Sequence, residues 1–161
     1  MTESNFTIGF IGLGLIGGSI AKGIRRVFPN YTLIGMDENP DTIKSALEEG
    51  IIDSVATDCK TDFADCNYVF LCAPVQYNVM YLKDLKESIN KDCILTDVGS
   101  VKEEIHLKIE ELGMEECFIG GHPMVGSEKA GFSFSSDRLV ENAYYFITPE
   151  FLPLHHAVLW S

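Results

Sequence analysis

The sequence predicts an α/β protein in which helices cover both faces of a mostly parallel sheet. Short apolar runs alternate with helix-like segments along the chain, which is the rhythm of strand–helix–strand units. These runs lack a regular polar alternation, as is typical of strands that are buried on both faces. With 161 residues, 46% of them hydrophobic, the chain is long enough for one domain with a real core.

The expected strands are runs rich in Val, Ile, Phe and Tyr. They cover residues 6–12, 32–37, 68–74, 93–99, 117–123 and 144–149, with a weaker candidate at 53–57. Strand–helix–strand units cross over with a right hand, which gives a mostly parallel sheet. The order expected of a doubly wound sheet of this kind is 3-2-1-4-5-6.

The expected helices lie between these strands. Helical periodicity and flanking breakers place them at residues 16–27, 41–50, 76–89 and 101–112. Gly50 and Gly113 follow two of them, where a glycine can terminate a helix.

The charge balance excludes several classes of partner. A net charge of -12 repels phosphate backbones and anionic lipid, so we expect neither nucleic acid nor a membrane as partner. The apolar N-terminal segment is too short and glycine-rich to span a bilayer. The five cysteines are scattered without a C-x-x-C pair, which predicts no metal site and no disulfide framework. We therefore expect a reducing compartment, the cytoplasm.

Glycines join the first expected strand to the first expected helix. Gly12, Gly14 and Gly17 form G-x-G-x-x-G, which allows a tight turn, the approach of a pyrophosphate and close helix–strand packing. The free N–H groups at the start of the helix, at Leu15 and Ile16, would face the phosphates. A merely flexible turn is the alternative interpretation of these glycines.

Asp37 ends the second expected strand, 20 residues after Gly17. A carboxylate at this point can accept hydrogen bonds from the ribose of a bound dinucleotide. No arginine follows it in the next few residues to bind a 2′-phosphate. The sequence therefore predicts a cofactor site for NAD rather than NADP.

Three chemical features follow strands whose carboxyl ends should meet near the cofactor. Ala73 and Pro74 end one strand, Ser100 follows the next, and His122 closes the sixth. Ser100 and Glu103 also form a capping-box pattern, which needs no substrate. Histidine titrates at about pH 6.5, which suits proton abstraction near neutrality, although a structural role is the alternative.

Together these residues resemble the prephenate/arogenate dehydrogenase family of tyrosine biosynthesis. The resemblance rests on GLGLIGGS from Gly12, CAPV from Cys72, DVGSVK from Asp97 and GGHPMVGSEKAG from Gly120. It implies a Rossmann-like fold and an NAD-dependent oxidative decarboxylation of prephenate to 4-hydroxyphenylpyruvate.

The resemblance also assigns roles to residues. It implies that His122 is the catalytic base, that Ser100 orients it and the substrate hydroxyl, and that Glu128 lines the substrate pocket. The family continues into a helical C-terminal domain that forms a homodimer and supplies an arginine for a substrate carboxylate.

The end of the sequence departs from that pattern. Residues 1–150 would form the NAD-binding domain, and 151–161, FLPLHHAVLWS, read as a short irregular tail unlike the family's helical domain. We expect a truncated part with poor activity of its own. The cations nearest the motifs in sequence are Lys102, Lys129 and Arg138.

Three other functions remain open. Arogenate dehydrogenases share the same motifs. A β-hydroxyacid dehydrogenase of the 3-hydroxyisobutyrate type would share the glycines but leave the motif around His122 unexplained. A non-catalytic NAD-sensing domain would need only the glycines and Asp37.

Overall fold

The computed structural model describes residues 5–126 and 128–148, and it confirms the expected fold class. The sheet has seven strands in the order β3-β2-β1-β4-β5-β6-β7. Five of the six pairings are parallel, and only β7 runs antiparallel, beside β6. The expected order 3-2-1-4-5-6 is therefore confirmed, with β7 added at the edge. Residues 151–161, the expected tail, lie outside the described residues.

The strands and helices occur where the apolar runs and helical periodicities predict them. The strands are β1 (Thr7–Ile11), β2 (Thr32–Met36), β3 (Ser54–Val55), β4 (Tyr68–Leu71), β5 (Ile94–Asp97), β6 (Phe118–Pro123) and β7 (Tyr145–Thr148). The helices are α1 (Leu15–Val27), α2 (Pro40–Glu48), α3 (Val75–Ser88), α4 (Glu103–Leu112) and two short 3-10 turns, η1 (Glu115–Cys117) and η2 (Phe132–Phe134).

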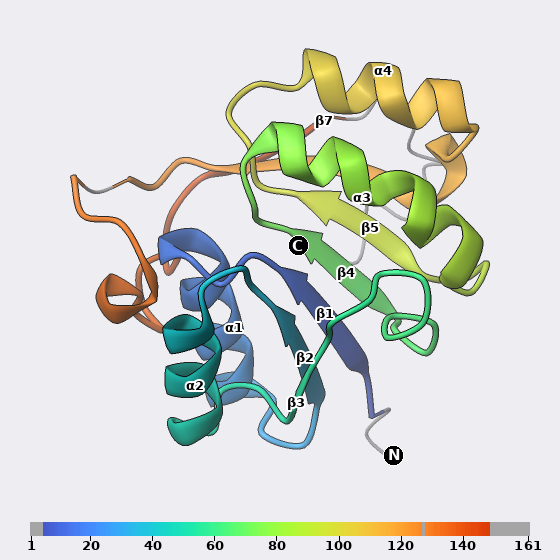
Figure 1. The fold of residues 1–161 in the computed structure, drawn as a ribbon. Helices are drawn as coiled ribbons and strands as arrows, with labels where there is room; N and C mark the ends of the chain where they lie inside the picture. Colours follow the sequence, from blue (N-terminus) through green and yellow to red (C-terminus); the bar gives the residue numbers. More distant parts are fainter. Residues whose placement is uncertain (1–4, 127, 149–161) are drawn as a thin grey trace.

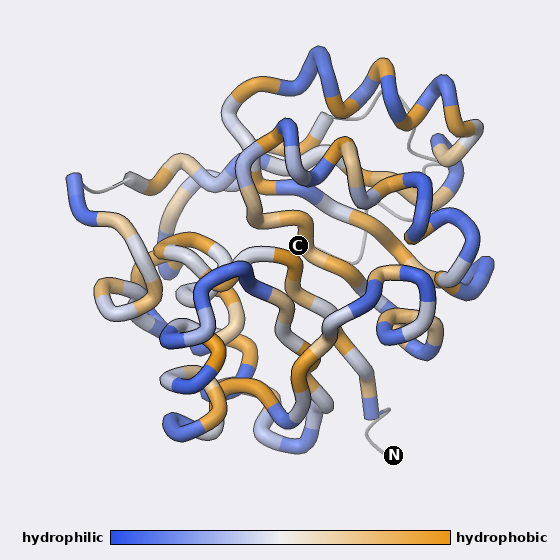
Figure 2. Tube along the Cα trace, viewed as in Figure 1, coloured by the Kyte–Doolittle hydropathy of each residue, from blue (hydrophilic) through white to orange (hydrophobic). Residues whose placement is uncertain are grey.

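Helices cover both faces of the sheet, α1 and α2 one face and α3 and α4 the other (Figure 1). On β1, Phe10 packs toward α1 while Ile11 packs toward α3 and α4, because successive side chains of a strand point to opposite faces. Figure 2 shows hydrophobic residues along the central strands and hydrophilic ones along the outer turns of the helices. The two buried clusters explain why the strand sequences show no polar alternation.

Three helix ends follow local chemistry. Gly113 takes a left-handed φ of 63° at the end of α4, and Gly50 takes 66° just after α2, as expected of glycines that terminate helices. Asn39 caps α2 by accepting a hydrogen bond from the N–H of Asp41 at 2.9 Å. Within the described ranges, no helix is long and apolar enough to cross a membrane.

Candidate active site

The glycine turn between β1 and α1 has the geometry that a dinucleotide requires. Gly12 has a φ of +92°, and a Cβ at this residue would lie 2.6 Å from the backbone nitrogen of Ala73. A Cβ at Gly17 would collide with the carbonyl oxygen of Gly12, so this glycine allows α1 to pack against the turn. A Cβ at Gly14 would meet nothing within 4 Å, which leaves open space beside the turn for a ligand.

The N-terminus of α1 is left free to bind an anion. Leu15, Ile16 and Gly17 are its first three residues, and their N–H groups have no partner within the helix. Gly14 at the N-cap provides no side-chain hydrogen bond, and the first turn carries no acidic residue. These N–H groups and the helix dipole favour a phosphate at this point.

A cavity of about 250 Å³ brings most of the expected cofactor residues together. Gly12, Gly14, Asp37, Ala73 and Pro74 all line it. The other lining residues are Ile11, Met36, Glu38, Cys72, Tyr77 and Tyr81. Tyr77 and Tyr81 belong to no sequence motif and are not among the expected site residues. They follow Pro74 on α3, and their spacing of four residues puts both on one face of this helix.

Asp37 has a second role that the sequence did not reveal. Its carboxylate accepts hydrogen bonds from the N–H of Leu13 at 2.7 Å and from the N–H of Asn39 at 2.9 Å. Each bond uses a different oxygen, and each oxygen can accept a further bond from a ribose hydroxyl. Asp37 therefore fixes the glycine turn and can also contact a nucleotide.

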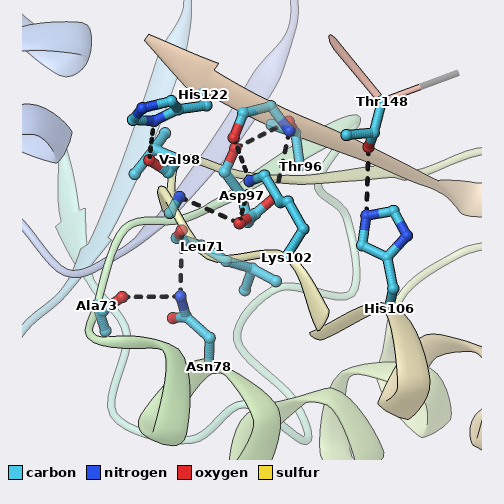
Figure 3. Close-up of polar contacts among 12 residues, drawn as sticks. Leu71, Ala73, Asn78, Thr96, Asp97, Val98, Lys102, His106, His122 and Thr148 are labelled. Carbon is cyan, nitrogen blue, oxygen red and sulfur yellow. Dashed lines mark hydrogen bonds and ion pairs between the residues drawn. The ribbon is translucent and has the colours of Figure 1, made fainter. Parts of the chain in front are cut away.

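An ion pair between Asp97 on β5 and Lys102 lies beside the expected catalytic residues, and both side chains bond the backbone of Gly121 on β6. Asp97 is only 1% exposed, and its Oδ2 lies 2.6 Å from the Nζ of Lys102. The carboxylate also accepts the N–H groups of Gly99 at 3.1 Å and Gly121 at 3.2 Å, and Lys102 donates to the carbonyl oxygen of Gly121 (Figure 3). Burial lowers the pKa of Lys102, and the contact with Asp97 opposes that shift.

His122 lies at the carboxyl end of β6, directly after this network. Its Nδ1 lies 3.4 Å from the carbonyl oxygen of Val98, which follows β5 (Figure 3). A carbonyl oxygen can only accept, so a hydrogen bond at this contact uses the N–H of Nδ1. The ring is half-buried, and this arrangement is the one that suits a base acting through Nε2.

Ser100 and Glu128, the other two expected site residues, are both exposed. Ser100 is exposed, two residues after Val98, and no hydrogen bond between described residues joins it to His122. The expected capping box is wrong, because α4 begins at Glu103 with Lys102 at its N-cap and no side-chain cap. Glu128 is exposed in the loop after β6.

The sequence profile of a known family matches residues 20–152: prephenate dehydrogenase, nucleotide-binding domain. This range is more than half of the chain. The chain belongs to this family.

Individual members show how much of the protein the chain represents. It is 36% identical over 151 residues to the prephenate dehydrogenase of Bacillus subtilis, covering 92% of this chain and 41% of the relative. It therefore spans about two fifths of that relative's length. A crystal structure of prephenate dehydrogenase from A. aeolicus, in complex with hydroxyphenyl propionate and NAD+, matches with a TM-score of 0.87 and 32% identity, over 99% of this chain and 56% of that one. Synechocystis arogenate dehydrogenase matches with a TM-score of 0.82 and 34% identity, over 95% and 54%.

His106 on α4 contacts both β6 and β7. Its Nε2 lies 3.2 Å from the Oγ1 of Thr148 on β7 (Figure 3). Its ring packs edge-on against Phe118, with 5.6 Å between the ring centroids. In the part of the chain that the structure describes, no group of three or more His, Cys, Asp or Glu is placed to hold a metal ion.

Proposed function

We propose that this chain is the NAD-binding half of a prephenate dehydrogenase and carries its catalytic base. The observation that carries the proposal is that Gly12, Gly14, Asp37 and Pro74 line the same cavity. The free N-terminus of α1 suits the pyrophosphate, and Asp37 suits the adenosine ribose. On this proposal residues 1–150 form one domain, which holds the cofactor and the proton acceptor.

The proposed reaction separates a hydride from a proton. NAD, when bound, supplies the hydride acceptor for the ring carbon that bears the substrate hydroxyl. The Nε2 of His122 takes the hydroxyl proton, with the imidazole held by the carbonyl oxygen of Val98. Ser100 would orient the substrate hydroxyl, and Glu128 would line the pocket. Loss of carbon dioxide then makes the ring aromatic, which renders the step effectively irreversible.

The first prediction concerns the choice of cofactor. We expect NAD to bind at least about tenfold more tightly than NADP, because the half-buried carboxylate of Asp37 would repel a 2′-phosphate. Titration calorimetry with each cofactor measures both affinities. Equal or tighter binding of NADP would contradict the role given to Asp37.

The second prediction tests the proposal on the chain as it stands. We expect it to bind NAD but to turn over prephenate very poorly, because a dicarboxylate needs a fixed cation to be held against the cofactor. Lys102 is already bonded to Asp97 and to the carbonyl oxygen of Gly121, so it is not available for this purpose. Calorimetry with NAD and the appearance of NADH at saturating prephenate are the two measurements. Absence of NAD binding would overturn the proposed function, and turnover equal to that of a two-domain enzyme would show that the whole site is already present.

Arogenate is the second candidate substrate. The chain is 34% identical to Synechocystis arogenate dehydrogenase and 32% identical to the A. aeolicus prephenate dehydrogenase. These two identities are too similar to favour one substrate over the other. The two substrates differ in one group, a keto acid or an amino acid. Parallel assays of a two-domain chain with both substrates would separate the two activities.

A further inference from the structure

A buried amide on α3 holds the turn that follows β4. Asn78 is 2% exposed, and its Nδ2 donates to the carbonyl oxygens of Ala73 at 2.8 Å and Leu71 at 3.3 Å (Figure 3). Its backbone N–H donates to the carbonyl oxygen of Pro74 at 3.1 Å. Carbonyl oxygens only accept hydrogen bonds, so the amide nitrogen must face them. One residue therefore fixes three carbonyl groups of this turn.

The side-chain amide of Asn78 includes one polar atom that does not stabilise the fold. Its Oδ1 is buried without a hydrogen-bond partner, and no other buried side-chain nitrogen or oxygen in the described part of the chain has this property. An unpaired buried acceptor lowers stability; a leucine of similar size would remove this acceptor but would also take the donors away from the carbonyl oxygens of Leu71 and Ala73. The useful part of Asn78 is therefore its pair of donors.

The turn that these donors hold lies directly against the glycine turn. A Cβ at Gly12 would lie 2.6 Å from the nitrogen of Ala73 and 2.7 Å from the carbonyl carbon of Cys72, so the two backbones are in direct contact. Ala73 and Pro74 also line the cofactor cavity together with Gly12 and Gly14. A small shift of the turn after β4 would therefore move the glycine turn or open a gap beside it.

We propose that Asn78 is a positioning residue of the dinucleotide site. Its two side-chain hydrogen bonds hold residues 71–74 at the distance from the glycine turn that binding of the pyrophosphate requires. This inference rests on the proposed function, in which the cavity binds NAD. Asn78 does not itself line the cavity but bonds to Ala73, which does.

The test compares NAD affinity and local backbone protection in the chain and its variants. We expect Asn78→Leu to weaken NAD binding about tenfold, since two hydrogen bonds that position the site are lost. In the absence of NAD, we expect the amides of Gly12 and Leu13, which donate to Met36 and Asp37, to exchange with solvent about tenfold faster. Asn78→Ser keeps one donor and should show intermediate changes, which covers the case in which the leucine variant does not fold.

Asn90 provides a matched control at another place in the fold. Its Nδ2 also donates to two carbonyl oxygens, those of Cys66 at 3.0 Å and Ala64 at 3.3 Å, but neither of these residues lines the cofactor cavity, whereas Ala73 does. Asn90→Leu should leave NAD affinity and the exchange of Gly12 and Leu13 unchanged. Unchanged affinity and exchange in the Asn78 variants, or equal effects in Asn90→Leu, would overturn the inference. Failure of the parent chain to bind NAD would instead overturn the proposed function, while the exchange measurements would still test the role of Asn78.

Discussion

Lys102→Met is expected to lower the free energy of unfolding by about 3 kcal/mol, because it leaves the carboxylate of Asp97 buried without its cation. The loss should lie at the lower end of the range for broken buried ion pairs, since two backbone N–H groups still donate to Asp97. Urea unfolding at neutral pH, followed by circular dichroism, measures the change.

Lys108→Met is the matched control for this experiment. Lys108 pairs with Glu111 at 2.8 Å, but the glutamate side chain is 65% exposed, so we expect a change of less than about 0.5 kcal/mol. The double variant Asp97→Asn/Lys102→Met should recover part of the stability, because it removes the unpaired charge. A loss below about 1 kcal/mol for Lys102→Met alone would show that the pair is not an essential link between β5 and β6.

His122→Asn is expected to lower turnover by roughly 10²-fold or more while leaving NAD affinity nearly unchanged. The reason is that asparagine cannot take the hydroxyl proton, whereas the cavity for the nucleotide does not include His122. The measurement requires a two-domain chain, for example residues 1–150 joined to the remaining part of the Bacillus subtilis relative. Steady-state rates and calorimetry on the same preparation separate catalysis from binding.

His106→Asn serves as the control for loss of a histidine from the same side of the sheet. His106 and its partners Thr148 and Phe118 are not among the residues that line the cofactor cavity, so turnover should stay near the parent value. If His122→Asn also kept most of the activity, His122 would be a structural residue and the proposed mechanism would be wrong.

Most of the fold was predictable because it depends on local patterns. The run Phe6–Gly12 and the periodicity from Ile16 to Val27 are enough to place β1 and α1. The glycine motif then predicts the turn between them, since the φ of +92° at Gly12 is one that few other residues adopt. The glycine motif also predicts the strand order, since it is typical of doubly wound sheets with the order 3-2-1-4-5-6.

Contacts between distant segments could not be predicted in the same way. The pattern of Ser100 and Glu103 predicts a capping box, but Lys102 is drawn to Asp97 and Gly121, and α4 starts after it. Asp37 was predicted as a ribose ligand, whereas its bond to the N–H of Leu13 depends on how β1 and β2 align. The contact of His106 with Thr148 likewise depends on β7 returning beside β6, 42 residues later.

The order of the strands divides the sheet into two halves that are each built from consecutive neighbours. Strands β1 to β3 form one half and β4 to β7 the other, and within the sheet they meet only where β1 pairs with β4. The proposed NAD site lies on this seam, with Gly12 on one side and Ala73 on the other. A ligand bound there would contact both halves of the sheet. The free energy of unfolding of the domain would therefore rise with ligand concentration by RT ln(1 + [L]/Kd). The stability of the folded chain would then depend on the concentration of free dinucleotide around it.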